Sequence, residues 1–132
     1  MADNINVITI EGRSGSGRTE AAMAIALSPL HEGANVLWLY PTQSHASDAL
    51  RRYRLRQSRI YPTEALTRGM QFVSSESVLG SDTFAHDSLK LVIVDDCELH
   101  RPGVIQQLLS EMSNQPGGEG KSVILIRNSF KW

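Results

Sequence analysis

The chain has 132 residues, of which 41% are hydrophobic and 20% charged, and its formal net charge is −1. This length fits one domain over residues 1–132. The small net charge excludes a protein that coats nucleic acid by bulk attraction, and no apolar run reaches the roughly 20 residues of a membrane span. One cysteine, Cys97, excludes an intramolecular disulfide framework. With no secretory signal at the start, we expect a cytoplasmic protein without a membrane contact.

Short apolar runs alternate with segments of helical periodicity along the chain. In chain order, the predicted elements are strand Ile5–Ile10, helix Thr19–Leu30, strand Ala34–Tyr40, helix His45–Arg56, strand Met70–Ser74, brief helix Ser75–Leu79, strand Leu89–Asp96, helix Pro102–Met112 and strand Ser122–Ile126. The predicted connections are Gln57–Thr67 with a short helix over Thr63–Thr67, the turn Gly80–Asp82 and the loop Asn114–Gly120.

Residues with special backbone chemistry mark several predicted boundaries. Pro29 and Gly33 indicate the end of the first helix, and Pro41 the end of the second strand. Ser44 is expected to cap the second helix, and Pro102 to lie in the first turn of the last helix.

Five strands that alternate with helices predict an α/β fold. We expect a three-layer sandwich, in which a mostly parallel five-stranded sheet carries helices on both faces and the first strand is buried. Ligands of such sheets bind where the strands end. The segments expected to converge there are Gly12–Thr19, Pro41–Thr42, Ser74–Ser75, Asp95–Asp96 and Arg127–Asn128.

The glycine-rich segment between the first strand and the first helix fits the phosphate-binding pattern G-x-x-x-x-G-K-[ST] at every position except Arg18, which replaces the lysine. Backbone N–H groups of such a loop, and the helix that follows, direct partial positive charge at a phosphate. Arginine can hold phosphate, but not in the geometry of lysine. The candidate nucleotide-binding residues are Gly12, Ser14, Gly15, Ser16, Gly17, Arg18 and Thr19. The alternative is a loop that only connects strand to helix.

Two carboxylates end the apolar strand that precedes Cys97. Asp95 is expected to hold Mg²⁺ through water, opposite the hydroxyl of Thr19, and Asp96 or Glu98 to orient the attacking water. Asp96 is one methylene shorter than the glutamate usual at that position, which weakens its assignment. In the alternative interpretation, Asp95 and Asp96 only end the strand and cap the next turn.

Gly12–Thr19 resembles a Walker A motif, and Val92–Asp96 resembles a Walker B motif. Their order is similar to that of the additional-strand class of P-loop NTPases, which has a RecA-like core. Val36–Thr42 resembles the strand and Pro-Thr motif of superfamily-two helicases and phage terminase large subunits. Asp95–Glu98 resembles their D-E-x-[DH] box.

This resemblance implies a protein that uses ATP and Mg²⁺, in a bacterial or phage-infected cell, with Asn128 as a polar sensor of the phosphate state. Arg18 and Asp96 depart from the motifs, and a helicase's second RecA-like domain and a terminase's nuclease domain are both missing. The resemblance therefore implies ATP binding with weak or partner-dependent hydrolysis, in a helicase-type or packaging-type motor core that needs a partner subunit or a homo-oligomer. One alternative is a degenerate module that binds a protein or nucleic-acid partner. Another is a small phosphotransferase resembling thymidine kinase, disfavoured because no arginine-rich lid or paired zinc cysteines are found.

Five of the 13 basic side chains lie within nine residues, at the end of the second predicted helix and just after it: Arg51, Arg52, Arg54, Arg56 and Arg59. They form either the solvated face of an amphipathic helix or a patch that contacts a DNA backbone or a neighbouring motor subunit. Only Tyr53 and Tyr61 accompany them, so base stacking is not indicated.

Overall fold

A computed structural model of the chain describes residues 5–12, 18–60, 70–79, 89–95, 97–113 and 121–128, and, within these ranges, not the side chains of residues 18–20, 23, 27, 31, 53–60, 98, 113 and 128. Its elements are β1 (Ile5–Gly12), α1 (Arg18–His31), β2 (Asn35–Tyr40), α2 (Gln43–Ile60), β3 (Met70–Ser74), α4 (Ser75–Val78), β4 (Leu89–Val94), the 3₁₀ turn η3 (Cys97–Leu99), α5 (Val104–Ser113) and β5 (Lys121–Asn128). The predicted short helix Thr63–Thr67, the turn Gly80–Asp82 and the loop Asn114–Gly120 lie outside the described residues.

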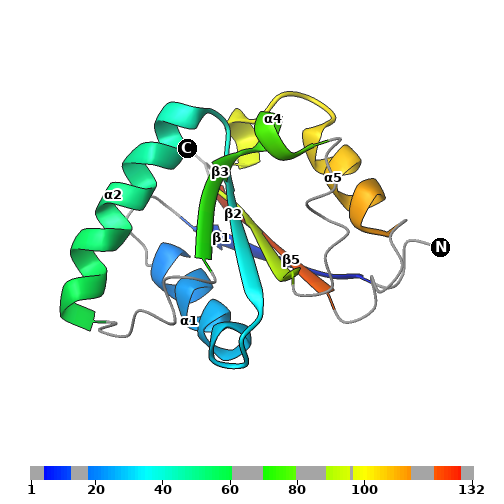
Figure 1. Cartoon of the computed structure of the whole chain (residues 1–132). Coiled ribbons are helices and arrows are strands. Elements are labelled where there is room, and N and C mark those ends of the chain that lie inside the picture. Colours follow the sequence, from blue (N-terminus) through cyan, green and yellow to red (C-terminus); the bar gives the residue numbers. More distant parts are fainter. Residues whose placement is uncertain are drawn as a thin grey trace.

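The five strands form one sheet in the order β1-β5-β4-β2-β3, and every neighbouring pair is parallel. The predicted α/β class is therefore confirmed, with a sheet that is parallel throughout. Parallel neighbours need crossover connections, which explains why helices separate the strands in sequence. β5 is the last strand of the chain, yet it lies between β1 and β4 (Figure 1). All strands consequently end at the same edge of the sheet.

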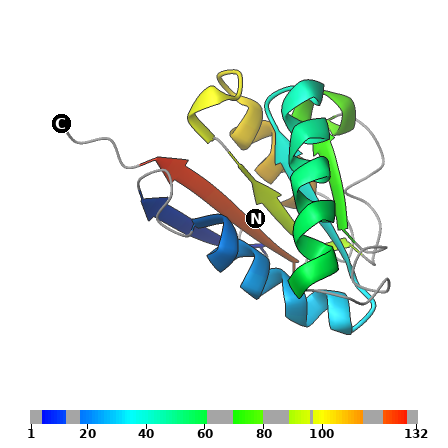
Figure 2. The same cartoon turned by 90° about the vertical axis from the view of Figure 1, so that its left-hand side faces the viewer.

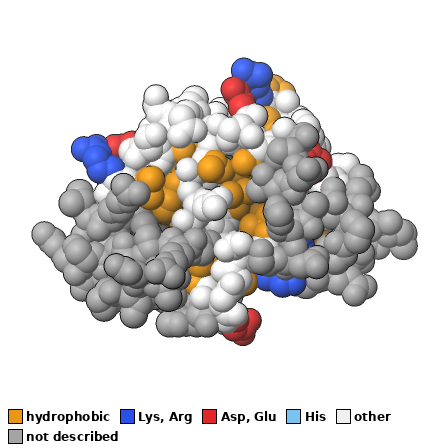
Figure 3. All heavy atoms as spheres, in the orientation of Figure 1, with side chains coloured by type: hydrophobic (Ala, Val, Ile, Leu, Met, Phe, Trp, Pro, Cys, Tyr) orange, Lys and Arg blue, Asp and Glu red, His pale blue; other side chains and the backbone are white. Residues whose placement is uncertain are grey.

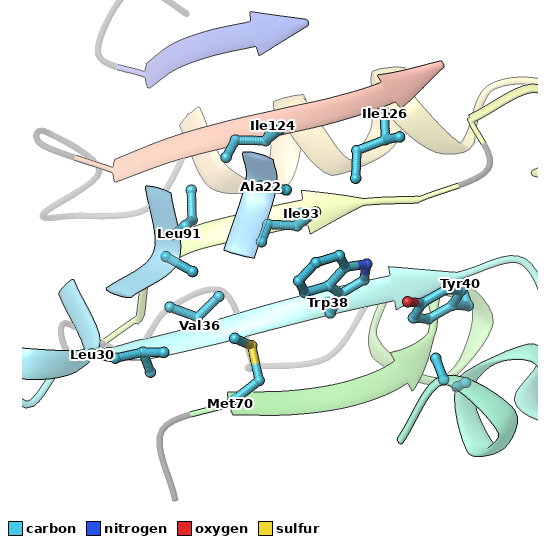
Figure 4. Close-up of a cluster of buried hydrophobic side chains, with 13 residues drawn as sticks. Ala22, Leu30, Val36, Trp38, Tyr40, Met70, Leu91, Ile93, Ile124 and Ile126 are labelled. Carbon is cyan, nitrogen blue, oxygen red and sulfur yellow. The ribbon is translucent and has the colours of Figure 1, made fainter. Parts of the chain in front are cut away.

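Helices cover both faces of the sheet, as predicted. α1 and α2 lie on one face, where Figure 2 shows them in front of the strands, and α4, η3 and α5 lie on the other. The buried side chains fall into two corresponding clusters. The first, drawn in Figure 4, is Ala22, Ala26, Leu30, Val36, Trp38, Tyr40, Ala46, Ala49, Met70, Leu91, Ile93, Ile124 and Ile126. The second is Ile5, Leu37, Leu39, Val78, Leu89, Val92, Val94, Cys97, Leu108, Met112, Val123 and Leu125.

β1 is an edge strand, so the prediction that it is buried was wrong. Ile5 is buried, but Val7 is 49% and Ile8 39% exposed. The reason is the sheet order, because β1 pairs with β5 on one side and, among the described residues, with no strand on the other. β1 and β5 pair over eight residues and therefore run to Gly12 and Asn128, beyond their predicted ends. β4 ends at Val94, before the predicted end at Asp96.

α1 continues past Pro29, which the sequence analysis placed at its end. The helix runs to His31, and Gly33 follows with φ of 84°. The Gly33 N–H donates to the Leu30 carbonyl at 3.1 Å, and the Ala34 N–H donates to the Pro29 carbonyl at 2.9 Å. These two bonds make a Schellman motif, in which a left-handed glycine closes the helix.

α2 begins at Gln43 and continues to Ile60, so it is longer than predicted. Its cap is Thr42, not Ser44: the Thr42 Oγ1 accepts the His45 N–H at 3.2 Å. Thr42 follows Pro41 and immediately precedes the first helical residue, where a hydroxyl reaches the N–H three residues on. Similarly, Pro102 lies before α5 rather than in its first turn.

In the part of the chain that the structure describes, no helix is long and apolar enough to cross a membrane.

Candidate functional site

The carboxyl edge of the sheet gathers the predicted site segments. In the strand register, Gly12 lies opposite Asn128, and Tyr40 lies opposite Ser74. The Asp95 N–H continues the β4 ladder by donating to the Leu39 carbonyl at 2.9 Å. The predicted convergence is therefore confirmed for those segments that the structure describes.

β5 separates the strand that leads into the glycine loop from the strand that ends before Asp95. Two strand spacings put β1 about 10 Å from β4. Asp95 follows the Val94–Leu125 pair by one residue, which makes it level with Ile126, the register partner of Ile10. β1 runs two residues further, so Gly12 lies about 7 Å beyond that level. Gly12, where the glycine loop starts, is thus displaced from Asp95 in two directions: further along the strand direction, and two strands away across the sheet.

Asp95 is 9% exposed, and its carboxylate is held by a tryptophan. The Trp38 Nε1–H donates to Asp95 Oδ2 at 3.2 Å across 57 residues of sequence. Trp38 belongs to the core cluster beneath α1 and α2, so the Asp95 carboxylate lies on this face of the sheet. α1 is also the helix that follows the glycine loop. The carboxylate and the N-terminus of α1 are therefore on the same face.

His100 holds the main chain of Asp95. Its Nε2 lies 2.7 Å from the Asp95 carbonyl oxygen, and its Nδ1 lies 3.0 Å from Ser75 Oγ. A carbonyl oxygen can only accept, so Nε2 carries a hydrogen and donates it, while Nδ1 and the Ser75 hydroxyl form a second hydrogen bond. His100 and Ser75 are both buried. Among the described residues, no buried side-chain nitrogen or oxygen lacks a hydrogen-bond partner.

The other predicted site residues are placed less completely. Gly12 ends β1, Arg18 and Thr19 are the first two residues of α1, and Glu98 lies in η3. The side chains outside the described part are those of Arg18, Thr19, Glu98 and Asn128, and the residues outside it altogether are Ser14, Gly15, Ser16, Gly17 and Asp96. The roles predicted for these residues in nucleotide binding, water activation and sensing therefore stay predictions.

Asp95 fits one particular kind of metal site. The described residues contain no group of three or more His, Cys, Asp or Glu side chains that could hold a metal ion by themselves. Mg²⁺ is usually bound by only one or two carboxylates, together with phosphate oxygens and waters. A single buried carboxylate such as that of Asp95 is suited to that mode of binding, and not to a cage made by protein alone.

The described arginines of α2 are already paired. Arg51 Nη2 lies 2.6 Å from Asp48 Oδ1, and Arg52 Nε lies 3.1 Å from Asp48 Oδ2. The Arg51 hydrogen bond is the main reason why the pKa of Asp48 is lowered. Figure 3 shows blue side chains directly beside a red one at the left of the visible face, over α2. These pairs are what a solvated helix face provides; the side chains of Arg54, Arg56 and Arg59 lie outside the description.

The chain is similar in sequence to part of a protein that is named as a DNA helicase. Over 139 aligned residues, the chain is 32% identical to the ATP-dependent DNA helicase RecG of Treponema pallidum (strain Nichols). The alignment covers 91% of this chain and 20% of the relative, so the chain spans about a fifth of that protein's length. No family model matches the sequence. This distant similarity, with the five-stranded parallel sheet, agrees with the resemblance to a RecA-like core.

Sequence reasoning missed Trp38, Ser75 and His100 as parts of the site. Trp38 was predicted as one apolar residue of the second strand, within the stretch that resembles a Pro-Thr motif. Ser75 was predicted as part of a converging segment and as the start of a brief helix. Ser75 and His100 are 25 residues apart in sequence, and no local pattern joins them. The available signals were weak: a hydrogen-bonding ring next to the end of an apolar strand, and a histidine five residues after Asp95.

Proposed function

We propose that the chain binds ATP with Mg²⁺ at the carboxyl edge of its sheet and forms a helicase-like NTPase core, whose hydrolysis is weak or depends on a partner. One observation carries the proposal: β5 lies between β1, which leads into the glycine loop, and β4, which ends before the buried Asp95. This strand order supports a phosphate site that the loop and the carboxylate share. The distant similarity to a protein named as an ATP-dependent DNA helicase supports the same function.

In the proposed site, the loop from Gly12 to Gly17 and the first turn of α1 bind the phosphates. Arg18 neutralises phosphate charge in place of the usual lysine, which favours binding over turnover. Thr19 and Asp95 would hold Mg²⁺, which supplies charge neutralisation when bound. Asp96 or Glu98 orients the attacking water, and Asn128 senses the phosphate state.

Two further parts of the proposal concern partners. The chain spans about a fifth of the similar helicase. In this proposal, hydrolysis uses a second subunit, either a motor protein or a second copy of this chain. DNA is the proposed nucleic-acid partner, because the similar relative is named as a DNA helicase. The similarity supports the helicase form of the prediction; no finding supports a terminase, a phage origin or a phosphotransferase.

Calorimetric titration of ATP with Mg²⁺ into the purified chain tests the proposal. We expect micromolar binding in the wild type that is lost in Arg18→Ala. Arg51→Ala is the matched control, because it removes an exposed arginine that is paired with Asp48, and it should bind ATP as the wild type does. Arg18→Lys, assayed for phosphate release, should raise hydrolysis if the arginine is what limits turnover. No binding by the wild type in two independent assays would reject the proposal.

A second candidate function is a non-catalytic module that binds another protein. The observation that favours it is the exposure of Val7, Ile8 and Ile25, the last at 41%, on β1 and α1. Large exposed apolar side chains on an open strand edge are typical of a binding surface. A stable complex with a motor protein, together with no response to any nucleotide, would favour this function over the first.

A further inference from the structure

Asp95 is held at two points by buried side chains that have no predicted role in the site. The Trp38 Nε1–H donates to the carboxylate at 3.2 Å, and the His100 Nε2–H donates to the main-chain carbonyl at 2.7 Å. The first bond restricts rotation of the carboxylate about the side-chain bonds. The second fixes the backbone from which this side chain projects, at the point where β4 has ended.

The donor in the first bond has little freedom of its own. Trp38 is 0% exposed, and its ring stacks on Tyr40 at a centroid distance of 6.5 Å and on Phe72 at 5.7 Å. Figure 4 shows the Trp38 ring within the core cluster, between Ile93 and Met70 of the neighbouring strands. A ring that is fully buried and stacked on two other rings keeps one orientation. Its N–H therefore points at a fixed position, and the Asp95 carboxylate is aligned to it.

The second donor is fixed from β3. His100 Nδ1 is hydrogen-bonded to the hydroxyl of Ser75, the first residue of α4, at 3.0 Å. The same two segments are joined again at the surface, where Arg101 Nη2 lies 2.7 Å from Glu76 Oε1. The segment after β4 is therefore bonded to the segment after β3 at two places. The buried one of these contacts includes His100, which also bonds to Asp95.

We propose that Trp38 and His100 are positioning residues for the Asp95 carboxylate and set how well the site orders Mg²⁺. This inference rests on the proposed function, in which Asp95 is a Mg²⁺ ligand. Groups that orient a metal ligand typically change metal affinity by about 10–100-fold when they are removed. The two side chains act through Asp95, because neither belongs to the loop or to the acidic motif.

The first test measures ATP binding against Mg²⁺ concentration in Trp38→Phe, which keeps an aromatic ring but removes the N–H. The Mg²⁺ concentration at half-maximal binding should rise about 10–100-fold, while ATP affinity without Mg²⁺ stays at the wild-type value. Phe72→Leu is the matched control, since it disturbs the same aromatic stack without a bond to Asp95. It should leave the Mg²⁺ requirement unchanged. An unchanged requirement in folded Trp38→Phe would overturn the proposal.

A second pair of variants tests His100 and leaves the large core side chain of Trp38 unchanged. His100→Leu removes both hydrogen bonds and should raise the Mg²⁺ requirement. His100→Gln retains an N–H donor for the Asp95 carbonyl and should restore much of the loss. A purely structural role would lower thermal stability in both variants and leave the Mg²⁺ requirement alone, which contradicts the proposal.

The indole N–H resonance of Trp38 in a ¹⁵N-labelled sample separates this inference from the proposed function. Trp132→Phe identifies the other tryptophan signal. The Trp38 resonance should shift in Asp95→Asn and also in His100→Leu, although His100 bonds only to the Asp95 main chain in this link. A shift in His100→Leu without ATP binding by the wild type would support the positioning and reject the nucleotide role. No shift in His100→Leu would overturn the positioning, whether or not ATP binds.

Discussion

Gly33 ends α1 in a backbone conformation that other residues adopt only at a cost. Its φ is +84°, and an added Cβ would meet no heavy atom within 4 Å, so Gly33→Ala introduces strain in the backbone but no clash. The left-handed conformation costs an L-residue about 1–2 kcal/mol. The smaller entropy of the unfolded alanine chain offsets about 0.4–1 kcal/mol of this. Gly33→Ala should therefore lower the free energy of unfolding by about 1 kcal/mol.

Urea unfolding followed by circular dichroism measures this change. With a slope of about 2 kcal/mol per molar urea, the midpoint should fall by about 0.5 M. The urea midpoint of Gly103→Ala should fall by a similar amount, because Gly103 has φ of +86° and equally open surroundings. Gly33→Asn should lose less unfolding free energy than Gly33→Ala, since asparagine tolerates this conformation better than alanine. A midpoint for Gly33→Ala at or above that of the wild type would refute the reasoning, and a loss beyond about 3 kcal/mol would indicate an additional contact.

Three other predictions use the same unfolding assay or an NMR titration. Thr42→Ala removes the α2 cap and should cost about 1 kcal/mol; no loss would contradict the cap. Leu108→Ala empties a site that is 0% exposed and should cost about 2–5 kcal/mol, whereas Val7→Ala, at 49% exposure, should cost much less; equal losses would contradict the burial of the two sites. The pKa of Asp48 should lie below its ordinary 3.8, so its stabilising contribution is complete above pH 3.8 and is lost as the pH falls through the lowered pKa. NMR titration of Arg51→Ala should return that pKa toward 3.8; an unchanged value would exclude the hydrogen bond as its main cause.

The order of the secondary-structure elements could be predicted because each has a local signal. The nearly continuous apolar runs of β2 and β4 indicate strands covered on both faces, and the structure covers both faces with helices. Boundaries were less predictable. Ser44 and Thr42 both have the chemistry of a cap, and only the path of the chain after β2 decides that the Thr42 hydroxyl oxygen accepts the helix N–H. Pro29 is a boundary signal in sequence, yet α1 continues two residues past it.

The candidate site likewise contains residues that the sequence could predict and residues that it could not. A glycine loop and a carboxylate after an apolar strand are contiguous patterns, so Gly12 and Asp95 could be proposed from sequence. Trp38, Ser75 and His100 could not, because each gains its role from a partner on another element. The exposure of β1 was equally hidden, since a strand at the edge of a sheet and one at its centre can have the same apolar sequence.

By itself, the sequence determined the α/β class, the five strands and the segments that meet at the carboxyl edge. It could do so because apolar periodicity and turn residues are local properties of the chain. Only the tertiary structure decided that β5 lies between β1 and β4, that β1 is an edge strand, and that Trp38 and His100 hold Asp95. These features depend on contacts between residues far apart in sequence, which the packing of the whole sheet selects.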